Sequence, residues 1–388
     1  MIKLIAVGEL RLGMFIHKLD VWWMKDKRIR NQMLITDPHQ IITLRHEGIQ
    51  AIWIDLDKSV QAPLAPAVEK KAIPRTPFFQ ELDKAQLIFQ QGKPKVLAMF
   101  NEARLGNSLD LSFMIDLVDE IAGSIEREPS ALLSVARLKS HDDYTYLHSM
   151  AVCGLMISLG KTLGLNEQQL RRAGMGGLLH DVGKAAVPLD ILNKPTKLTE
   201  EEFNVMRQHP IIGAQILMEA DADEDLLDIA LHHHERYDGN GYPHGLKGEQ
   251  ITRFARMAAV CDVYDALTST RVYRRGWTPA EAMHNMLSWR GHFDSHLLNT
   301  FVRTIGIYPV GSLVRLASGR VALVVKAGEK SLLRPCVHVF WSLHAQREMK
   351  PEIVDLGDSF CTDSIVSAEE SNLWINVDLN RIWALHAA

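Results

Sequence analysis

Seven histidine and aspartate residues are spaced along the middle of this chain in a pattern that could bind metal ions. Imidazole and carboxylate groups are ligands of metals that activate water. Seven such groups indicate two metal ions rather than one, and a two-metal site points to hydrolysis of a phosphate ester. The seven candidates are His148, His180, Asp181, His209, His233, His234 and Asp262.

Each candidate taken alone also has an ordinary structural explanation. A pair such as His180-Asp181 is commonly a surface dipeptide or a hydrogen-bonded core group, and 232–234 could be a solvated polar run. His209 could simply favour the dipole at a helix C-terminus. Asp262 lies within an apolar helical stretch, where an unpaired charge is costly and a metal ion would offset the cost. The joint occurrence of all these groups on successive helical segments favours a metal site.

The region from about 130 to 306 has the sequence pattern of an all-α domain. Three capping boxes are predicted, in which the first side chain bonds the N3 amide and the fourth reaches back. Apolar residues also recur at three- and four-residue spacing in three stretches, which indicates helices with one buried face. The boxes begin at Asn166, Thr199 and Thr278, and the apolar stretches are 147–163, 201–218 and 251–267.

The N-terminal residues 1–60 are predicted to form a small β-rich module. A turn and strand over 11–20 and an alternating strand over 51–57 indicate a sheet, with a helix over 37–48 between them. Four prolines within 61–77 then mark a linker or a segment that lies along the surface.

Two helices are expected over 78–105 and 110–127. Gly92 and Pro94 are predicted to break the first of them into two pieces. These helices could pair between subunits in a homodimer, and an intramolecular hairpin would explain them equally well.

The C-terminal residues 309–388 are predicted to form a second small β-rich module. The segments 312–316 and 321–325 indicate a β-hairpin, and 336–342 and 373–378 resemble further strands. The sequence therefore predicts four parts, which are the module 1–60, the linker 61–77, a helical domain with its preceding helices over 78–308, and the module 309–388.

Composition sets limits on the class of protein. The 388 residues have a formal net charge of −4, so no basic field favours duplex nucleic acid as a partner. The four cysteines are far apart, which argues against a disulfide framework and fits a reducing compartment. We find no signal peptide and no run approaching the ~18 apolar residues that a membrane helix needs. A cytoplasmic location is therefore expected, without insertion into a membrane.

Residues 140–306 contain the motifs His180-Asp181-Val182-Gly183-Lys184, His209-Pro210, the run from His233 to Pro243, and Asp262 with Arg271-Val272-Tyr273-Arg274. With these motifs the region resembles the HD-GYP domain, a subgroup of the HD phosphohydrolase superfamily. Residues 5–60 also resemble, less strongly, the N-terminal domain often found ahead of HD-GYP domains in bacteria. The implied fold is a central all-α HD-type domain flanked by small β-rich modules.

The resemblance implies a cyclic-guanylate-specific phosphodiesterase that opens cyclic di-GMP to pGpG. Whether pGpG is cleaved further to GMP stays open. A hydroxide that bridges two divalent metal ions would attack phosphorus. Iron or manganese is favoured, and zinc or nickel also fits a ligand set without sulfur. One ion would take His148, His180, Asp181 and Asp262, and the second would take Asp181 as a bridge with His209, His233 and His234.

Some relatives hold a third ion. The positions that would supply its extra ligands are here Tyr144 and Leu189, neither of which is a good ligand, so two ions are expected. His232 is predicted to face away from the metals.

Substrate contacts follow from the same resemblance. Lys184 is expected to contact a nonbridging phosphate oxygen and to act in catalysis with Asp181. Arg271 and Arg274 match positions where the family holds substrate phosphates, a role that suits the planar guanidinium fork. Tyr242 could bond a phosphate or stack on a base. The alternatives are a solvent-facing Lys184 and a merely basic helix end at the two arginines.

Glu235 and Asp238 are expected to orient histidines and the loop rather than to bind metal. Two further functional hypotheses stay open. One is a sensor or interaction protein that binds cyclic di-GMP but turns it over poorly. The other is a phosphodiesterase for another cyclic dinucleotide, such as cyclic GMP-AMP. The flanking modules would regulate or dimerise the enzyme.

Overall fold

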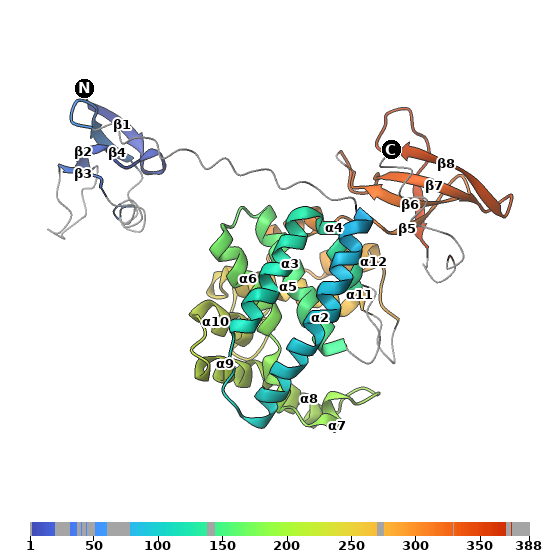
Figure 1. Ribbon diagram of the computed structural model, residues 1–388, viewed down its shortest axis with the longest axis horizontal. Coiled ribbons are helices and arrows are strands. Elements are labelled where there is room, and N and C mark those ends of the chain that lie inside the picture. Colours follow the sequence, from blue (N-terminus) through green and yellow to red (C-terminus); the bar gives the residue numbers. More distant parts are fainter. Residues whose placement is uncertain are drawn as a thin grey trace. The chain divides into compact units, whose positions relative to one another are not determined.

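The structure is a computed structural model of the whole chain, drawn in Figure 1. Contacts between residues divide it into two compact units, Met1–Ala72 and Ile73–Ala388. The predicted fold class is confirmed, because a helical domain is preceded and followed along the chain by small β-rich modules. The division into four parts at the boundaries given above stays a prediction. The structure describes residues 2–19, 32–36, 40, 44, 51–59, 78–137, 144–269, 275–328, 330–369 and 374.

The first unit contains an antiparallel sheet of four strands in the order β1-β4-β2-β3. Alternate residues of the last strand, Ile52 and Ile54, are buried, as the alternating sequence pattern predicts. The helix predicted over 37–48 lies outside the described residues except at two positions. The elements are β1 (Ile2–Ala6), the short 3-10 helix η1 (Val7–Glu9), β2 (Phe15–Leu19), β3 (Met33–Leu34) and β4 (Ala51–Asp55).

Helices make up most of the second unit. None of them, within the part that the structure describes, is long and apolar enough to cross a bilayer. They are α2 (Phe78–Leu105), α3 (Ser112–Arg127), α4 (Pro129–Arg137), α5 (Tyr144–Thr162), α6 (Glu167–Leu179), η3 (Val182–Ala186), α7 (Leu189–Leu192), α8 (Glu200–Met206), α9 (His209–Glu219), α10 (Glu224–His232), η4 (Gly248–Gln250), α11 (Arg253–Thr268), α12 (Pro279–Ser288) and α13 (Ser295–Ile305).

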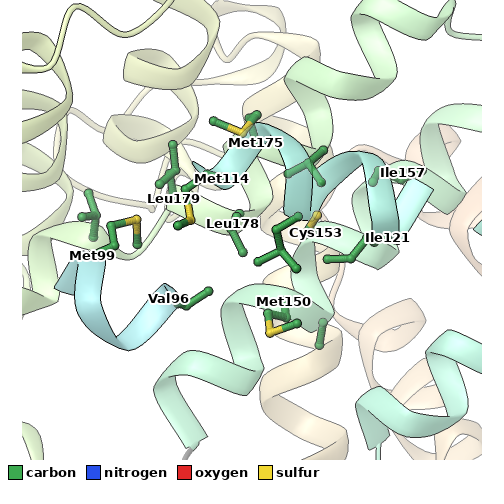
Figure 2. Close-up of a cluster of buried hydrophobic side chains, with 14 of the residues drawn as sticks. Val96, Met99, Met114, Ile121, Met150, Cys153, Ile157, Met175, Leu178 and Leu179 are labelled. Carbon is green, nitrogen blue, oxygen red and sulfur yellow. The ribbon is translucent and has the colours of Figure 1, made fainter. Parts of the chain in front are cut away.

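The core of the helical domain forms where α2, α3, α5 and α6 pack on one another. Side chains from these four helices meet there, including Met150 and Cys153 of α5 and Leu178 of α6 (Figure 2). Every residue of α5 from 148 to 160 is buried, so this helix is covered on all its faces. The packing places the first turns of α5 against the last turn of α6, where the candidate site lies.

The predicted break in the first helix is wrong. Helix α2 continues through Gly92 and Pro94 without interruption. A Cβ atom at Gly92 would lie 2.6 Å from Cε of Met150 and 2.8 Å from a methyl group of Leu117. The glycine therefore permits a close approach of α2 to its neighbours. Tertiary packing along the helix outweighs the hydrogen bond that the proline removes.

All three predicted capping boxes are present, at Asn166, Thr199 and Thr278. The stretch 201–218, in contrast, is not one helix. It is divided into α8 and α9, and Pro210 occupies the first turn of α9, where its missing N–H leaves no bond unmade. His209 therefore begins a helix and does not end one.

The C-terminal module is an antiparallel sheet of five strands in the order β8-β7-β6-β5-β9. The predicted hairpin and the strand over 336–342 are confirmed, whereas the sequence pattern does not predict β8 and β9. Of the strand predicted over 373–378 the structure describes Trp374, which is helical. Phe78 and Ala131 pack against this sheet. The strands are β5 (Leu313–Leu316), β6 (Arg320–Lys326), β7 (Cys336–Ser342), β8 (Arg347–Asp355) and β9 (Ile365–Ala368).

Candidate metal centre

The seven predicted metal ligands come together at one place in the helical domain. They form two groups, and within each group one ligand atom per residue lies within 4.8 Å of the others. Six of the seven side chains are buried, and His234 is half-buried. The first group is His148 from α5, His180 from the end of α6 and Asp262 from α11, and the second is Asp181 before η3, His209 at the start of α9, and His233 and His234 after α10.

Asp181 lies between the two groups. Its Oδ2 atom is 3.6 Å from Nε2 of His148 and 3.3 Å from Nε2 of His180. Its Oδ1 atom is 3.2 Å from Nε2 of His209 and 3.7 Å from Nε2 of His233. The two oxygens of one carboxylate therefore face different groups of histidines, which is the arrangement that a bridging ligand requires.

Backbone carbonyl groups orient three of the histidines. In each case Nδ1 donates to a carbonyl oxygen in the preceding turn, so Nε2 of the ring faces the centre. Helix ends supply these acceptors, because their last carbonyls lack helical partners. The bonds run from His180 to Gly177 at 2.8 Å, from His209 to Met206 at 2.7 Å and from His233 to Ala230 at 2.9 Å.

His148 is oriented by a carboxylate instead. Its Nδ1 donates to Oδ2 of Asp265 at 2.6 Å, and its Nε2 lies 3.0 Å from Oδ1 of Asp262. Asp265 is one turn beyond Asp262 on α11. The structure therefore places Asp265 behind the imidazole of His148, on the side away from the other ligands.

The pKa values follow from burial and from the partners. Burial lowers the pKa of His233 to about 4, and burial also holds that of His234 well below its usual value. Burial alone would raise the pKa of Asp181, but the Lys184 ammonium and His180 hold it well below its ordinary range. Burial alone would lower the pKa of His148, but bonds with two carboxylates raise it. Neutral imidazoles and ionised carboxylates are the forms that bind metals.

The donor set fits divalent metal ions. Nε2 of His180 and Oδ1 of Asp181 are buried and form no hydrogen bond within the described part of the protein. A buried polar atom without a partner is costly, and a bound cation would satisfy both atoms. Nitrogen and oxygen donors without sulfur suit iron, manganese, zinc or nickel.

The described residues include two of the four predicted substrate contacts, Lys184 and Tyr242. The ammonium of Lys184 lies 2.5 Å from Oδ2 of Asp181, so this lysine faces the centre and not solvent. The ring of Tyr242 stacks on that of His234, with 4.8 Å between ring centroids. Arg271 and Arg274 lie outside the described residues.

A carboxylate organises the loop that carries Tyr242. Glu235 is buried and accepts hydrogen bonds from the backbone amides of His244, Gly245 and Leu246, at 2.7, 3.0 and 3.0 Å. It thus orients the loop, as expected. Gly241 is needed in the same turn, because a Cβ atom there would lie 2.3 Å from the amide nitrogen of Arg236.

Three further positions complete the surroundings. Asp238 accepts from the Arg236 side chain at 2.6 Å. His232, expected to face away from the metals, bonds Asp228 at 2.7 Å through its Nδ1. Of the two positions linked to a third ion, Leu189 begins α7 with an exposed aliphatic side chain, and the side chain of Tyr144 lies outside the described residues.

Comparison with known proteins identifies relatives of this chain. Residues 125–297 match a family model described as an HD domain, and residues 2–112 match one described as a domain of unknown function, DUF3391. The chain is 44% identical to a cyclic di-GMP phosphodiesterase of Pseudomonas aeruginosa, over 99% of this chain and 96% of that protein.

Two other relatives match the helical region. A cyclic di-GMP phosphodiesterase response regulator of Xanthomonas campestris is 43% identical over 46% of this chain and 48% of that protein. A 3′3′-cGAMP-specific phosphodiesterase of Vibrio cholerae is 35% identical over 45% of this chain and 41% of that protein.

Proposed function

This chain belongs to the HD-GYP family of HD-domain phosphodiesterases, and we propose that it hydrolyses cyclic di-GMP to linear pGpG. The observation that supports this most strongly is the position of Asp181, whose two oxygens face two separate groups of histidines. The near full-length relative from Pseudomonas aeruginosa, named a cyclic di-GMP phosphodiesterase, supports the choice of substrate.

We assign the seven residues to two divalent ions, iron or manganese, in the two groups that the geometry defines. When bound, the ions would lower the pKa of a water molecule and neutralise charge on the phosphoryl group. Asp181 would be shared between the ions. The other six residues would hold them through nitrogen or carboxylate oxygen.

The remaining polar groups bind and orient the substrate. Lys184, beside Asp181, is placed to pair with a nonbridging phosphate oxygen. Burial raises the pKa of Tyr242, so its hydroxyl stays protonated and can donate to an anionic oxygen. Arg271 and Arg274 are proposed to bind the phosphates through their planar forks.

Further cleavage of pGpG to GMP stays a prediction, as do a homodimer and a cytoplasmic location.

A turnover assay tests the proposal. The full chain is purified without oxygen, loaded with iron or manganese and assayed with cyclic di-GMP, and the metal content of the same sample is measured. Formation of pGpG by protein with about two metals per chain supports the proposal. Two bound metals without turnover of any cyclic dinucleotide contradict it and favour a sensor.

A second candidate substrate is 3′3′-cGAMP, because the relative from Vibrio cholerae is named for it. Parallel assays with equal concentrations of both dinucleotides separate the two. A higher kcat/KM for 3′3′-cGAMP would replace cyclic di-GMP in the proposal and leave the metal centre unchanged.

A further inference from the structure

The side chains of Phe203, Arg207 and Tyr242 form a stacked group beside the metal centre. Phe203 and Arg207 belong to none of the sequence motifs described above. The guanidinium of Arg207 lies 4.6 Å from the ring centroid of Phe203 and 5.3 Å from that of Tyr242. Phe203 lies four residues earlier, in α8, so the two side chains share one face of the helix end. The arginine is thereby held against aromatic rings.

The group is continuous with the metal centre. Tyr242 stacks on His234, which belongs to the second ligand group. Arg207 also precedes His209 by two residues, and the rings of His209 and His234 lie 5.0 Å apart. Tyr242 thus connects Arg207 with the second ligand group, so a ligand bound at the two histidines is also near Arg207.

Arg207 is exposed, and among the described residues no carboxylate pairs with it. Arg256 shows the contrasting case. It lies 5.9 Å from the ring centroid of Tyr237, but its Nη1 bonds Asp294 at 2.7 Å. The fork of Arg256 is thus occupied by a carboxylate, whereas the fork of Arg207 is available to a ligand.

Phe203 adds an apolar surface. Its side chain is 41% exposed beside the arginine, so part of the ring is open to a ligand. Aromatic rings and guanidinium planes are the surfaces on which nucleobases stack. The combination of an open fork with an exposed ring fits a base better than a phosphate alone, because a phosphate gains nothing from the ring.

We propose that Arg207 recognises a guanine base of the cyclic dinucleotide, with Phe203 as the surface on which the base stacks. This inference rests on the proposed function and names a specificity determinant for it. An arginine fork donates two hydrogen bonds to O6 and N7 of guanine. Adenine offers an amino donor in place of O6, so the same fork discriminates against adenine.

Equilibrium binding tests the contact without turnover. The full chain, with metals removed, is titrated with cyclic di-GMP and with its analogue in which 7-deazaguanine replaces guanine. The wild-type protein is expected to bind the analogue about tenfold more weakly, because one of two arginine bonds is lost. In Arg207→Ala the two ligands are expected to bind equally, since their difference depends on the fork.

Arg207→Lys is the matched control, because it keeps the charge and removes the planar fork. We expect this variant also to bind the two ligands equally. Full recovery of wild-type affinity in Arg207→Lys would show a charge contact with phosphate and overturn the base assignment. A tenfold preference that persists in Arg207→Ala overturns it as well.

The same measurements distinguish a failure of the role given to Arg207 from a failure of the proposed function. Wild-type protein that hydrolyses cyclic di-GMP but binds both ligands equally overturns the role of Arg207 alone. Wild-type protein that neither binds nor hydrolyses any cyclic dinucleotide overturns both proposals.

Discussion

Nδ1 of His148 donates a hydrogen bond of 2.6 Å to Oδ2 of Asp265, across 117 residues of sequence. The bond joins α5 to α11 at the edge of the metal centre. It sets the orientation of the imidazole and directs Nε2 toward Asp262 and Asp181. Partners of this kind hold a ligand ring in place and raise its basicity.

Replacing Asp265 with Asn is expected to weaken metal binding or activity about 10–100-fold, because the amide no longer supports His148 as a carboxylate does. Metal affinity, measured by competition with a chelator, and kcat on the same samples check this. Asp116→Asn, at an exposed carboxylate on α3, is the matched control. Equal metal affinity in both variants would remove the role given to Asp265.

Asp181→Asn tests the shared carboxylate. The change keeps the shape of the side chain but removes the charge that faces both groups, so turnover should fall about a thousandfold, or about 4 kcal/mol. The metal content per chain should fall with it. Circular dichroism should show the helical content retained. A folded variant that keeps two metals and normal turnover argues against a shared ligand.

Glu235→Gln tests the loop. The carboxylate of Glu235 accepts three backbone hydrogen bonds, whereas an amide presents one acceptor and one NH₂ group to the same amides. The variant should lose about 1–3 kcal/mol of local or global stability. Amide exchange at 244–246 should become faster, and KM should rise more than kcat falls. Unchanged exchange at these amides would contradict the structural role.

Gly183→Ala tests the contact between η3 and α9. A Cβ atom at Gly183 would lie 1.9 Å from the carbonyl oxygen of His209, and this backbone cannot move without displacing the histidine. We expect a loss of about 1–3 kcal/mol in the free energy of unfolding, together with weaker metal binding.

Gly123→Ala is the control for that change. Gly123 lies within α3, and a Cβ atom there would have Nη1 of Arg127 as its nearest neighbour, at 3.3 Å, in a side chain that also bonds Glu81. The gain in helix propensity of about 1 kcal/mol opposes this mild contact, so the free energy of unfolding should change much less than in Gly183→Ala. Similar thermal midpoints for the two variants would count against the close contact at Gly183.

His292 is expected to make the folded protein less stable at acidic pH. Burial lowers the pKa of His292 to about 4, with a further contribution from Arg236. Between that value and about 6.5 the unfolded chain binds a proton that the folded chain does not. The free energy of unfolding therefore keeps its full value above a pH of about 6.5. It decreases as the pH falls from there toward the pKa of the folded protein.

Replacing His292 with Asn should flatten this pH dependence. The thermal midpoint of metal-free protein at pH 7 and pH 5 measures it. The wild type should lose more on acidification than the variant. An identical loss in both would show that other groups, such as His233, account for the whole effect.

The sequence alone determined which residues could bind metal and where several helices begin. Capping boxes at Asn166, Thr199 and Thr278 were predictable because they involve side chains and amides within one turn. The seven candidate ligands could be named because their chemistry is a property of the residue type, and the HD-GYP motif placed them together.

Tertiary structure decided the rest. The hydrogen bond from His148 to Asp265 and the two directions faced by Asp181 depend on helices that are distant in sequence. The continuity of α2 through Pro94 and the stacking of Arg207 on Tyr242 likewise depend on neighbours that no local pattern specifies. The physical reason is that packing, burial and pKa arise from contacts between segments, whereas capping and ligand type are local properties of the chain.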